Sequence, residues 1–139
     1  MIALDDKHAP RLAVLDDEAR MRKALCRLLR THDFEVETFA AGEELIAGVQ
    51  RVDCLVLDLH MPGMSGFDVL REFLARDIKL PVIVITGHDE PPNPARARAL
   101  GACAYLTKPL DEASLLAAIS EATAPGGNSA GTRYGRRDA

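Results

Sequence analysis

The sequence predicts an α/β domain built on a doubly wound parallel sheet of five strands, with helices on both faces. Apolar runs of four to six residues alternate with segments whose apolar residues recur at helical spacing. This alternation is typical of repeated βα units around a parallel sheet that is buried on both faces. Because the crossover connections of such units are right-handed, successive helices can cover both faces of the sheet.

Each strand is expected where a short apolar run is bounded by polar or turn-forming residues. The predicted strands are Arg11 to Leu15, Phe34 to Phe39, Cys54 to Asp58, Pro81 to Thr86 and Ala104 to Thr107. The predicted helices are Glu18 to Thr31, Gly42 to Val49, Ser65 to Arg76, about Pro94 to Leu100 and Asp111 to Ala122. The fourth helix is expected to begin late and to run short, because Pro91, Pro92 and Pro94 crowd its start.

The strand order 2-1-3-4-5 is assigned by analogy with flavodoxin-like sheets. In that order the winding reverses between the first and third strands, and ligands bind outside the carboxyl ends of the strands at this point. The first strand leads into Asp16 and Asp17, and the third strand ends in Asp58. The three acids are therefore expected to converge where the fold predicts a binding site.

The chain is long enough for one globular domain, since it has 139 residues of which 47% are hydrophobic. We expect an N-terminal extension over residues 1–10, the domain over 11–124 and a C-terminal tail over 125–139. The tail is rich in Gly, Ser, Asn and Arg and shows no apolar periodicity, so it is expected to be disordered.

Charge and cysteine content favour a cytoplasmic protein with neither nucleic-acid nor membrane partners. A net charge of −4 provides no basic field for direct binding of nucleic acid. No apolar stretch approaches the ~18 residues of a membrane span, and the N-terminal residues lack the apolar core of a signal peptide. Cys26, Cys54 and Cys103 are widely spaced in apolar stretches, which is typical of core packing in a reducing compartment.

Four predicted strands end in residues that together suit phosphoryl transfer. Asp58 can attack phosphorus as a carboxylate nucleophile if the charge on the transferring group is neutralised. Its grouping with Asp16 and Asp17 brings three like charges together, which a hard divalent cation such as Mg²⁺ would relieve. Lys108 would supply a further positive charge and Thr86 a hydroxyl donor.

Each of these residues also has an ordinary structural interpretation when it is taken alone. Asp16 and Asp17 could cap the following helix, Asp58 and Thr86 could be polar strand ends, and Lys108 could be an exposed loop lysine. Their occurrence at four strand ends of one sheet favours a common site.

From Leu12 to Ala122 the chain resembles the receiver domain of two-component response regulators. The motifs that carry the resemblance are Val14-Leu15-Asp16-Asp17, Asp58-Leu59-His60-Met61-Pro62-Gly63-Met64-Ser65-Gly66, Ile83-Val84-Ile85-Thr86-Gly87-His88, Leu100-Gly101-Ala102 and Tyr105-Leu106-Thr107-Lys108-Pro109. Their wording is most similar to regulators of the nitrogen-fixation and nitrate-response type.

The resemblance implies a role for each matching residue. Asp58 would accept the phosphoryl group and would bind Mg²⁺ together with Asp17 and the main-chain carbonyl of His60. Apart from the resemblance, the imidazoles of His60 and His88 would extend the ligand set and let Mn²⁺ compete with Mg²⁺. Asp16 would act largely through a bound water. Lys108 would pair with the phosphoryl oxygens, through a cis peptide bond to the proline that follows it.

The resemblance also implies a phosphorylation-activated switch. Thr86 would move to hydrogen-bond the new phosphate and Tyr105 would rotate inward, which alters the surface of the predicted elements Pro94 to Leu100, Ala104 to Thr107 and Asp111 to Ala122. The implied partners are a sensor histidine kinase or phosphotransfer protein, a downstream protein or output domain, and a second copy in a phosphorylation-dependent homodimer.

His60 and His88 are departures specific to this chain, each two residues beyond a site residue. We expect them to flank the mouth of the phosphoryl pocket, where they would shield or orient the attacking water; the alternative is that both rings point into solvent. Because an imidazole titrates near pH ~6.5, the lifetime of phospho-Asp58 is expected to vary between about pH 5.5 and 8.

Two other classes of protein compete with the switch. A haloacid-dehalogenase-type phosphatase also uses an Asp nucleophile, but it has a second acid where this chain has His60, and its metal-binding acids come late in the sequence. A pseudo-receiver scaffold would lack part of the set of acids, Thr and Lys, which is complete here. The chain is therefore expected to be no turnover enzyme beyond self-phosphorylation from a donor and slow autodephosphorylation.

Overall fold

Residues 10–48 and 51–124 are described by the computed structural model. Within these ranges one parallel sheet has the strand order β2-β1-β3-β4-β5, which confirms the predicted fold. The strands are β1 (Arg11–Leu15), β2 (Glu35–Phe39), β3 (Cys54–Asp58), β4 (Val82–Thr86) and β5 (Ala104–Thr107). The helices are α2 (Ala19–Thr31), α3 (Gly42–Gly48), α4 (Gly66–Ala75), α5 (Asn93–Ala99) and α6 (Glu112–Thr123).

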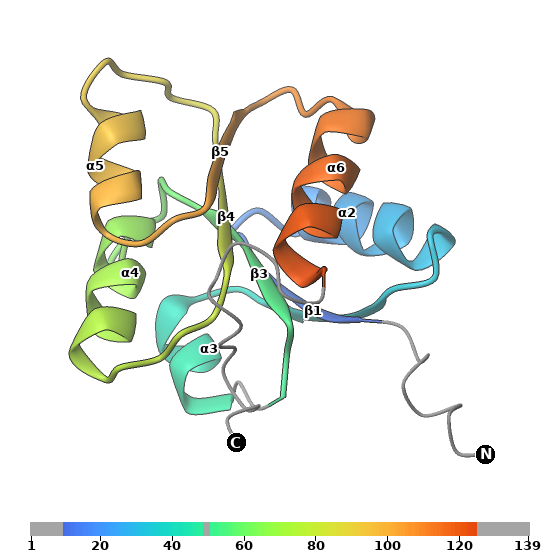
Figure 1. Cartoon of the computed structure of the whole chain (residues 1–139), viewed down its shortest axis with the longest axis horizontal. Coiled ribbons are helices and arrows are strands. Elements are labelled where there is room, and N and C mark those ends of the chain that lie inside the picture. Colours follow the sequence, from blue (N-terminus) through green and yellow to red (C-terminus); the bar gives the residue numbers. More distant parts are fainter. Residues whose placement is uncertain (1–9, 49–50, 125–139) are drawn as a thin grey trace.

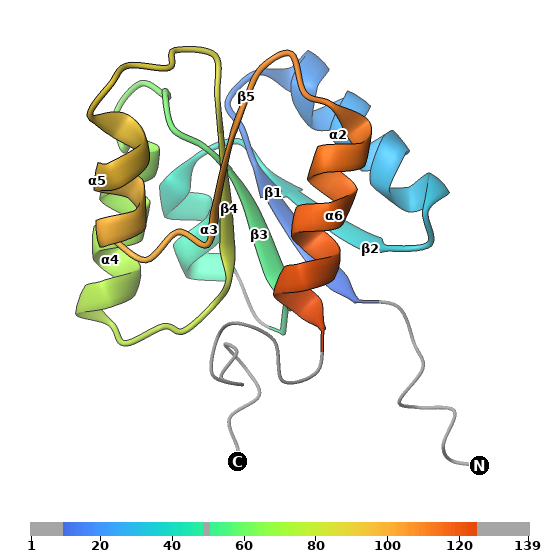
Figure 2. The ribbon, with the colours of Figure 1, turned by 45° about the horizontal axis from the view of Figure 1, so that its top comes forward.

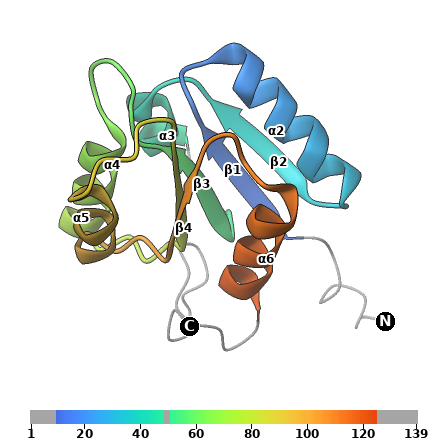
Figure 3. The same cartoon turned by 90° about the horizontal axis from the view of Figure 1, so that it is seen from above.

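The sheet lies between two helical layers (Figure 1; Figure 3). Side chains alternate along β1, so that Leu12 and Val14 pack in the core beneath α2 and α6, whereas Ala13 and Leu15 pack in the core beneath α3, α4 and α5. All five residues of β3 and all five of β4 are buried, as the near-continuous apolar runs predict. No helix in the described ranges is both long and apolar enough to span a membrane.

The ends of the elements follow from their capping residues. Ser65 caps α4 in a reciprocal capping box with Asp68, and Arg76 is the residue at its other cap. The predicted helix Ser65 to Arg76 is therefore α4 together with its two cap residues. The fourth predicted helix, α5, is short as expected but begins at Asn93, one residue before the predicted Pro94. Pro94 lies in the first turn, where its missing N–H leaves no hydrogen bond unmade, so it does not delay the helix.

The predicted terminal segments lie almost entirely outside the described residues. Of the N-terminal extension over 1–10 only Pro10 is described, and none of the tail over 125–139 is. The expected disorder of the tail therefore stays a prediction. Val49, the predicted last residue of the second helix, also lies outside the described residues.

The carboxyl ends of the strands meet at one edge of the sheet, at the top of Figure 1 and turned forward in Figure 2. The pairings Leu15 with Leu57, Asp58 with Ile85 and Thr86 with Thr107 bring the last residues of neighbouring strands to about the same level. The loops that follow β1, β3, β4 and β5 consequently surround one site.

Candidate functional site

Three carboxylates gather at this edge of the sheet. Asp16, Asp17 and Asp58 each offer an oxygen, and the three oxygens lie within 4.8 Å of one another. Asp16 is fully buried and Asp58 is 3% exposed, whereas Asp17 is exposed to solvent. The convergence that was predicted from the strand ends is therefore present in the structure.

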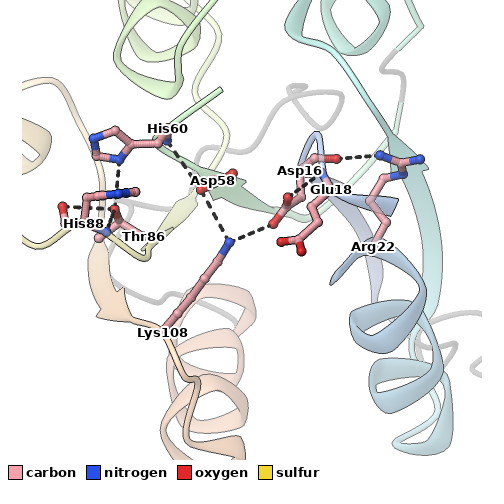
Figure 4. Close-up of polar contacts among 8 residues, drawn as sticks. All are labelled: Asp16, Glu18, Arg22, Asp58, His60, Thr86, His88 and Lys108. Carbon is pink, nitrogen blue, oxygen red and sulfur yellow. Dashed lines mark hydrogen bonds and ion pairs between the residues drawn. The ribbon is translucent and has the colours of Figure 1, made fainter. Parts of the chain in front are cut away.

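Asp16 is held in place by the start of α2. Its Oδ1 accepts a hydrogen bond of 2.9 Å from the backbone N–H of Glu18, and its main-chain carbonyl accepts one of 2.9 Å from the Arg22 guanidinium (Figure 4). With its backbone and one oxygen held, Asp16 directs the other oxygen, Oδ2, toward Lys108.

Lys108 reaches across the acid cluster from the end of β5. Its Nζ lies 3.2 Å from Asp16 Oδ2 and 3.7 Å from Asp58 Oδ1 (Figure 4). Its backbone N–H donates to the carbonyl of Thr86 at 2.8 Å, which fixes the start of the loop. The peptide bond from Lys108 to Pro109 is cis, as predicted. The ammonium group thus partly neutralises two of the acids.

The surroundings of Asp58 disfavour its ionised form. Burial, and after it repulsion from Asp16, raises the pKa of Asp58 from 3.8 to about 6. Lys108 and a 3.4 Å hydrogen bond from the backbone N–H of His60 oppose this rise, and repulsion from Asp17 makes the smallest contribution to it. The ionised carboxylate is therefore less stable here than in water, and an additional cation beside it would stabilise it.

Thr86 is fully buried at the end of β4, and its hydroxyl contacts the two histidines of the neighbouring loops. Its Oγ1 lies 3.1 Å from His60 Nδ1, accepts a hydrogen bond of 3.0 Å from the His88 N–H, and lies 3.2 Å from the His88 carbonyl (Figure 4). The two imidazole rings are 4.6 Å apart between centroids and tilted by 52°. Both histidines therefore lie beside Thr86, and both are exposed to solvent. Their predicted place at the mouth of the phosphoryl pocket and their influence on phosphate lifetime stay predictions.

Tyr105 lies apart from the acid cluster. Its hydroxyl donates a hydrogen bond of 3.1 Å to the Asp89 carboxylate in the loop after β4. Partial burial and this neighbouring carboxylate raise the pKa of Tyr105, so the phenol remains a protonated donor. The structure therefore places the predicted switch tyrosine next to the loop that also carries His88.

The sequence predictions missed two contacts that shape the site. One is the Arg22 bond to the Asp16 carbonyl, for which a cation in the first turn after the acid pair is the sequence signal. The other involves Gly66: a Cβ at this position would lie 2.6 Å from the Asp58 carbonyl oxygen, so only glycine lets α4 begin so close to β3. A glycine directly after the loop serine is its signal.

Three aspartates and a lysine at the carboxyl edge of a five-stranded doubly wound sheet are the arrangement that the resemblance to receiver domains implies. Comparison with known proteins agrees. Residues 12–120 match the response regulator receiver domain, and the chain belongs to that family. The match confirms the family that the motifs predict. It also argues against the phosphatase alternative, since receiver domains are regulatory signalling modules and not classical enzymes.

Among curated relatives, nodulation protein W of Bradyrhizobium diazoefficiens is 38% identical over 112 residues, which are 79% of this chain and 49% of that protein. Transcriptional regulatory protein FixJ of Azorhizobium caulinodans is 40% identical over 109 residues, 76% of this chain and 51% of that protein. The chain thus spans about half the length of these two relatives.

Solved structures show the same fold. The crystal structure of FixJ-N matches with a TM-score of 0.78 at 34% identity, over 84% of this chain and 94% of that chain. Chemotaxis protein CheY4 of Vibrio cholerae matches with a TM-score of 0.74 at 28% identity, over 81% and 97%. Receiver domains generally bind Mg²⁺ at an acidic pocket, and the three clustered aspartates form such a pocket here.

Proposed function

We propose that this chain is a phosphorylation-activated signalling switch in which Asp58 accepts the phosphoryl group. The donor is a sensor histidine kinase or a phosphotransfer protein. The observation that supports this most strongly is the nearly buried Asp58 carboxylate, clustered with two further acids and 3.7 Å from the Lys108 ammonium. A nucleophile and a cation for the transferred group thus share one small pocket.

The three aspartates fit Mg²⁺, which prefers hard oxygen ligands. Asp17, Asp58 and the main-chain carbonyl of His60 would hold the ion, and Asp16 would contact it largely through a water molecule. When bound, the ion supplies positive charge that balances the acids and the oxygens of the incoming phosphoryl group. Mn²⁺, which also accepts carboxylate ligands, is a further ion for this site.

In the transfer step a carboxylate oxygen of Asp58 forms a bond to phosphorus while the bond from phosphorus to the donor atom breaks. The electron pair of the broken bond leaves with the donor, and the product is an acyl phosphate. Lys108 neutralises charge on the phosphoryl oxygens, since its Nζ already lies between the carboxylates of Asp16 and Asp58. Asp58 must be ionised to attack, and Lys108 acts in that direction by lowering the pKa of this carboxyl.

The signal leaves the site through Thr86 and Tyr105. Thr86 donates its hydroxyl hydrogen to the new phosphate, and Tyr105 gives up its bond to Asp89 and turns inward. These movements change the surface formed by α5, β5 and α6, which a downstream protein or an output domain reads. The same surface would support a homodimer of phosphorylated chains.

The proposal requires one phosphoryl group per chain at a time and no steady-state hydrolysis of phosphomonoesters. Incubation with acetyl phosphate and Mg²⁺ is expected to add the mass of one phosphoryl group to the intact protein. On a small phosphomonoester, steady-state release of phosphate is expected to stay at the level of a buffer control. Many turnovers per chain would contradict the switch and favour the phosphatase class, while a mass gain with no turnover is the expected result.

A further inference from the structure

Among the described residues, three polar groups lie within hydrogen-bonding distance of the Thr86 hydroxyl. A hydroxyl group has one hydrogen to donate and two lone pairs to accept with. If Thr86 donates to the His88 carbonyl at 3.2 Å, its oxygen accepts from the His88 N–H at 3.0 Å and from His60 Nδ1–H at 3.1 Å (Figure 4). This assignment satisfies all three contacts, and in it no hydrogen of Thr86 faces the acid cluster.

His60 is the one side chain in this set of contacts, because both His88 contacts to Thr86 are made by the main chain. The His60 ring lies beside the His88 ring, with centroids 4.6 Å apart. The backbone N–H of His60 donates to Asp58 Oδ1 at 3.4 Å. A single residue thus contacts both the proposed acceptor and the proposed switch residue.

We propose that the His60 side chain is a positioning residue that holds Thr86 in its resting orientation. The inference rests on the proposed function, because a Thr86 hydroxyl that turns to donate to the phosphoryl group on Asp58 must leave both His60 and the His88 main chain. Loss of one such hydrogen bond changes a two-state population by about two- to tenfold. Removing the imidazole therefore shifts unphosphorylated Thr86 toward its active orientation by about this factor.

The test measures the Thr86 side-chain rotamer by NMR in the whole unphosphorylated chain. Three-bond couplings and the carbon shift of the Thr86 methyl group report the population of each χ1 rotamer. His60→Ala and His60→Leu, which lack any hydrogen-bonding group, are both expected to raise the minor rotamer about two- to tenfold. His60→Asn is expected to stay close to the wild type, because its amide can reach the place of Nδ1.

His32→Ala is the matched control, since His32 is an exposed histidine that bonds Glu112 at 3.1 Å, between the end of α2 and the start of α6. It is expected to leave the Thr86 rotamers unchanged. Wild-type rotamer populations in both His60→Ala and His60→Leu would overturn the proposal. Acetyl phosphate labelling of the same samples separates the two claims, because an absence of label counts against the proposed function while the rotamers of unphosphorylated Thr86 still decide the role of His60.

Discussion

Asp58→Asn is expected to stabilise the metal-free protein against unfolding at neutral pH, by about 1 to 3 kcal/mol. Burial and the neighbouring Asp16 raise the pKa of Asp58 from 3.8 to about 6, so the ionised carboxylate opposes folding. A rise of that size corresponds to about 3 kcal/mol, and a neutral amide avoids most of this cost. Urea denaturation of both proteins in excess chelator measures the difference.

The stabilisation has a defined pH window. Between pH 3.8 and about 6 the folded wild type binds more protons at Asp58 than the unfolded chain, so its stability falls relative to the variant as the pH rises. The difference between the two proteins should therefore be small near pH 3.8, grow up to about pH 6 and stay constant above it. Saturating Mg²⁺ should close the gap, because it binds the folded wild type more tightly than the variant.

Asp68→Asn provides a control of opposite sign. The backbone N–H of Ser65 is the main cause of a lowered pKa for Asp68, whose carboxylate completes the capping box of α4. Its contribution to stability is present above the unfolded pKa and is lost as the pH falls, so this variant should lose stability at neutral pH. A gain in stability for both variants would point to a general effect of net charge, and it would contradict a specific cost of burying the ionised Asp58.

Thr86→Ala is expected to separate phosphorylation from signalling. The substitution leaves Asp58, Lys108 and the acid cluster intact, so labelling by acetyl phosphate should remain close to the wild-type level. The hydroxyl that would bond the phosphate is absent, so most of the change at α5 and β5 should be lost. Amide chemical shifts of that surface, recorded with and without phosphorylation, measure the loss directly.

Two further threonine variants sharpen this experiment. Thr86→Ser keeps a hydroxyl and should restore the shift changes. Thr107→Ala alters the exposed β5 threonine that pairs with Thr86 across the sheet, and it should leave them intact. Equal shift changes in Thr86→Ala and the wild type would remove this hydroxyl from the mechanism.

The fold was predictable because its central strands are buried on both sides. The continuous apolar runs that end in Asp58 and Thr86 have few interpretations other than strands of a parallel sheet. The acid cluster was predictable for a related reason, since the carboxyl ends of parallel strands meet at one edge. Apolar patterns do not specify which strands are neighbours, however, and the order was assigned by analogy.

Other features depend on distances that periodicity does not contain. The start of α5 at Asn93 depends on local backbone geometry around Pro94. The approach of Gly66 to the carbonyl of Asp58 depends on how closely α4 meets β3. The hydrogen bond between His60 and Thr86 depends on the rotamers of both side chains. Sequence analysis predicted that both residues lie near the pocket, but it did not predict this contact.

If Asp58 is the acceptor, labelling of the chain must depend both on this residue and on a divalent cation. Intact-mass analysis after treatment with acetyl phosphate should show a single phosphoryl adduct on the wild-type chain in Mg²⁺, and none in excess chelator. Asp58→Asn should show no adduct under either condition. The control Asp53→Asn changes a partly buried aspartate directly before β3, at the end of the strand opposite Asp58, and should label like the wild type. An undiminished adduct on Asp58→Asn, or full labelling of the wild type in chelator, would contradict Asp58 as the metal-dependent acceptor.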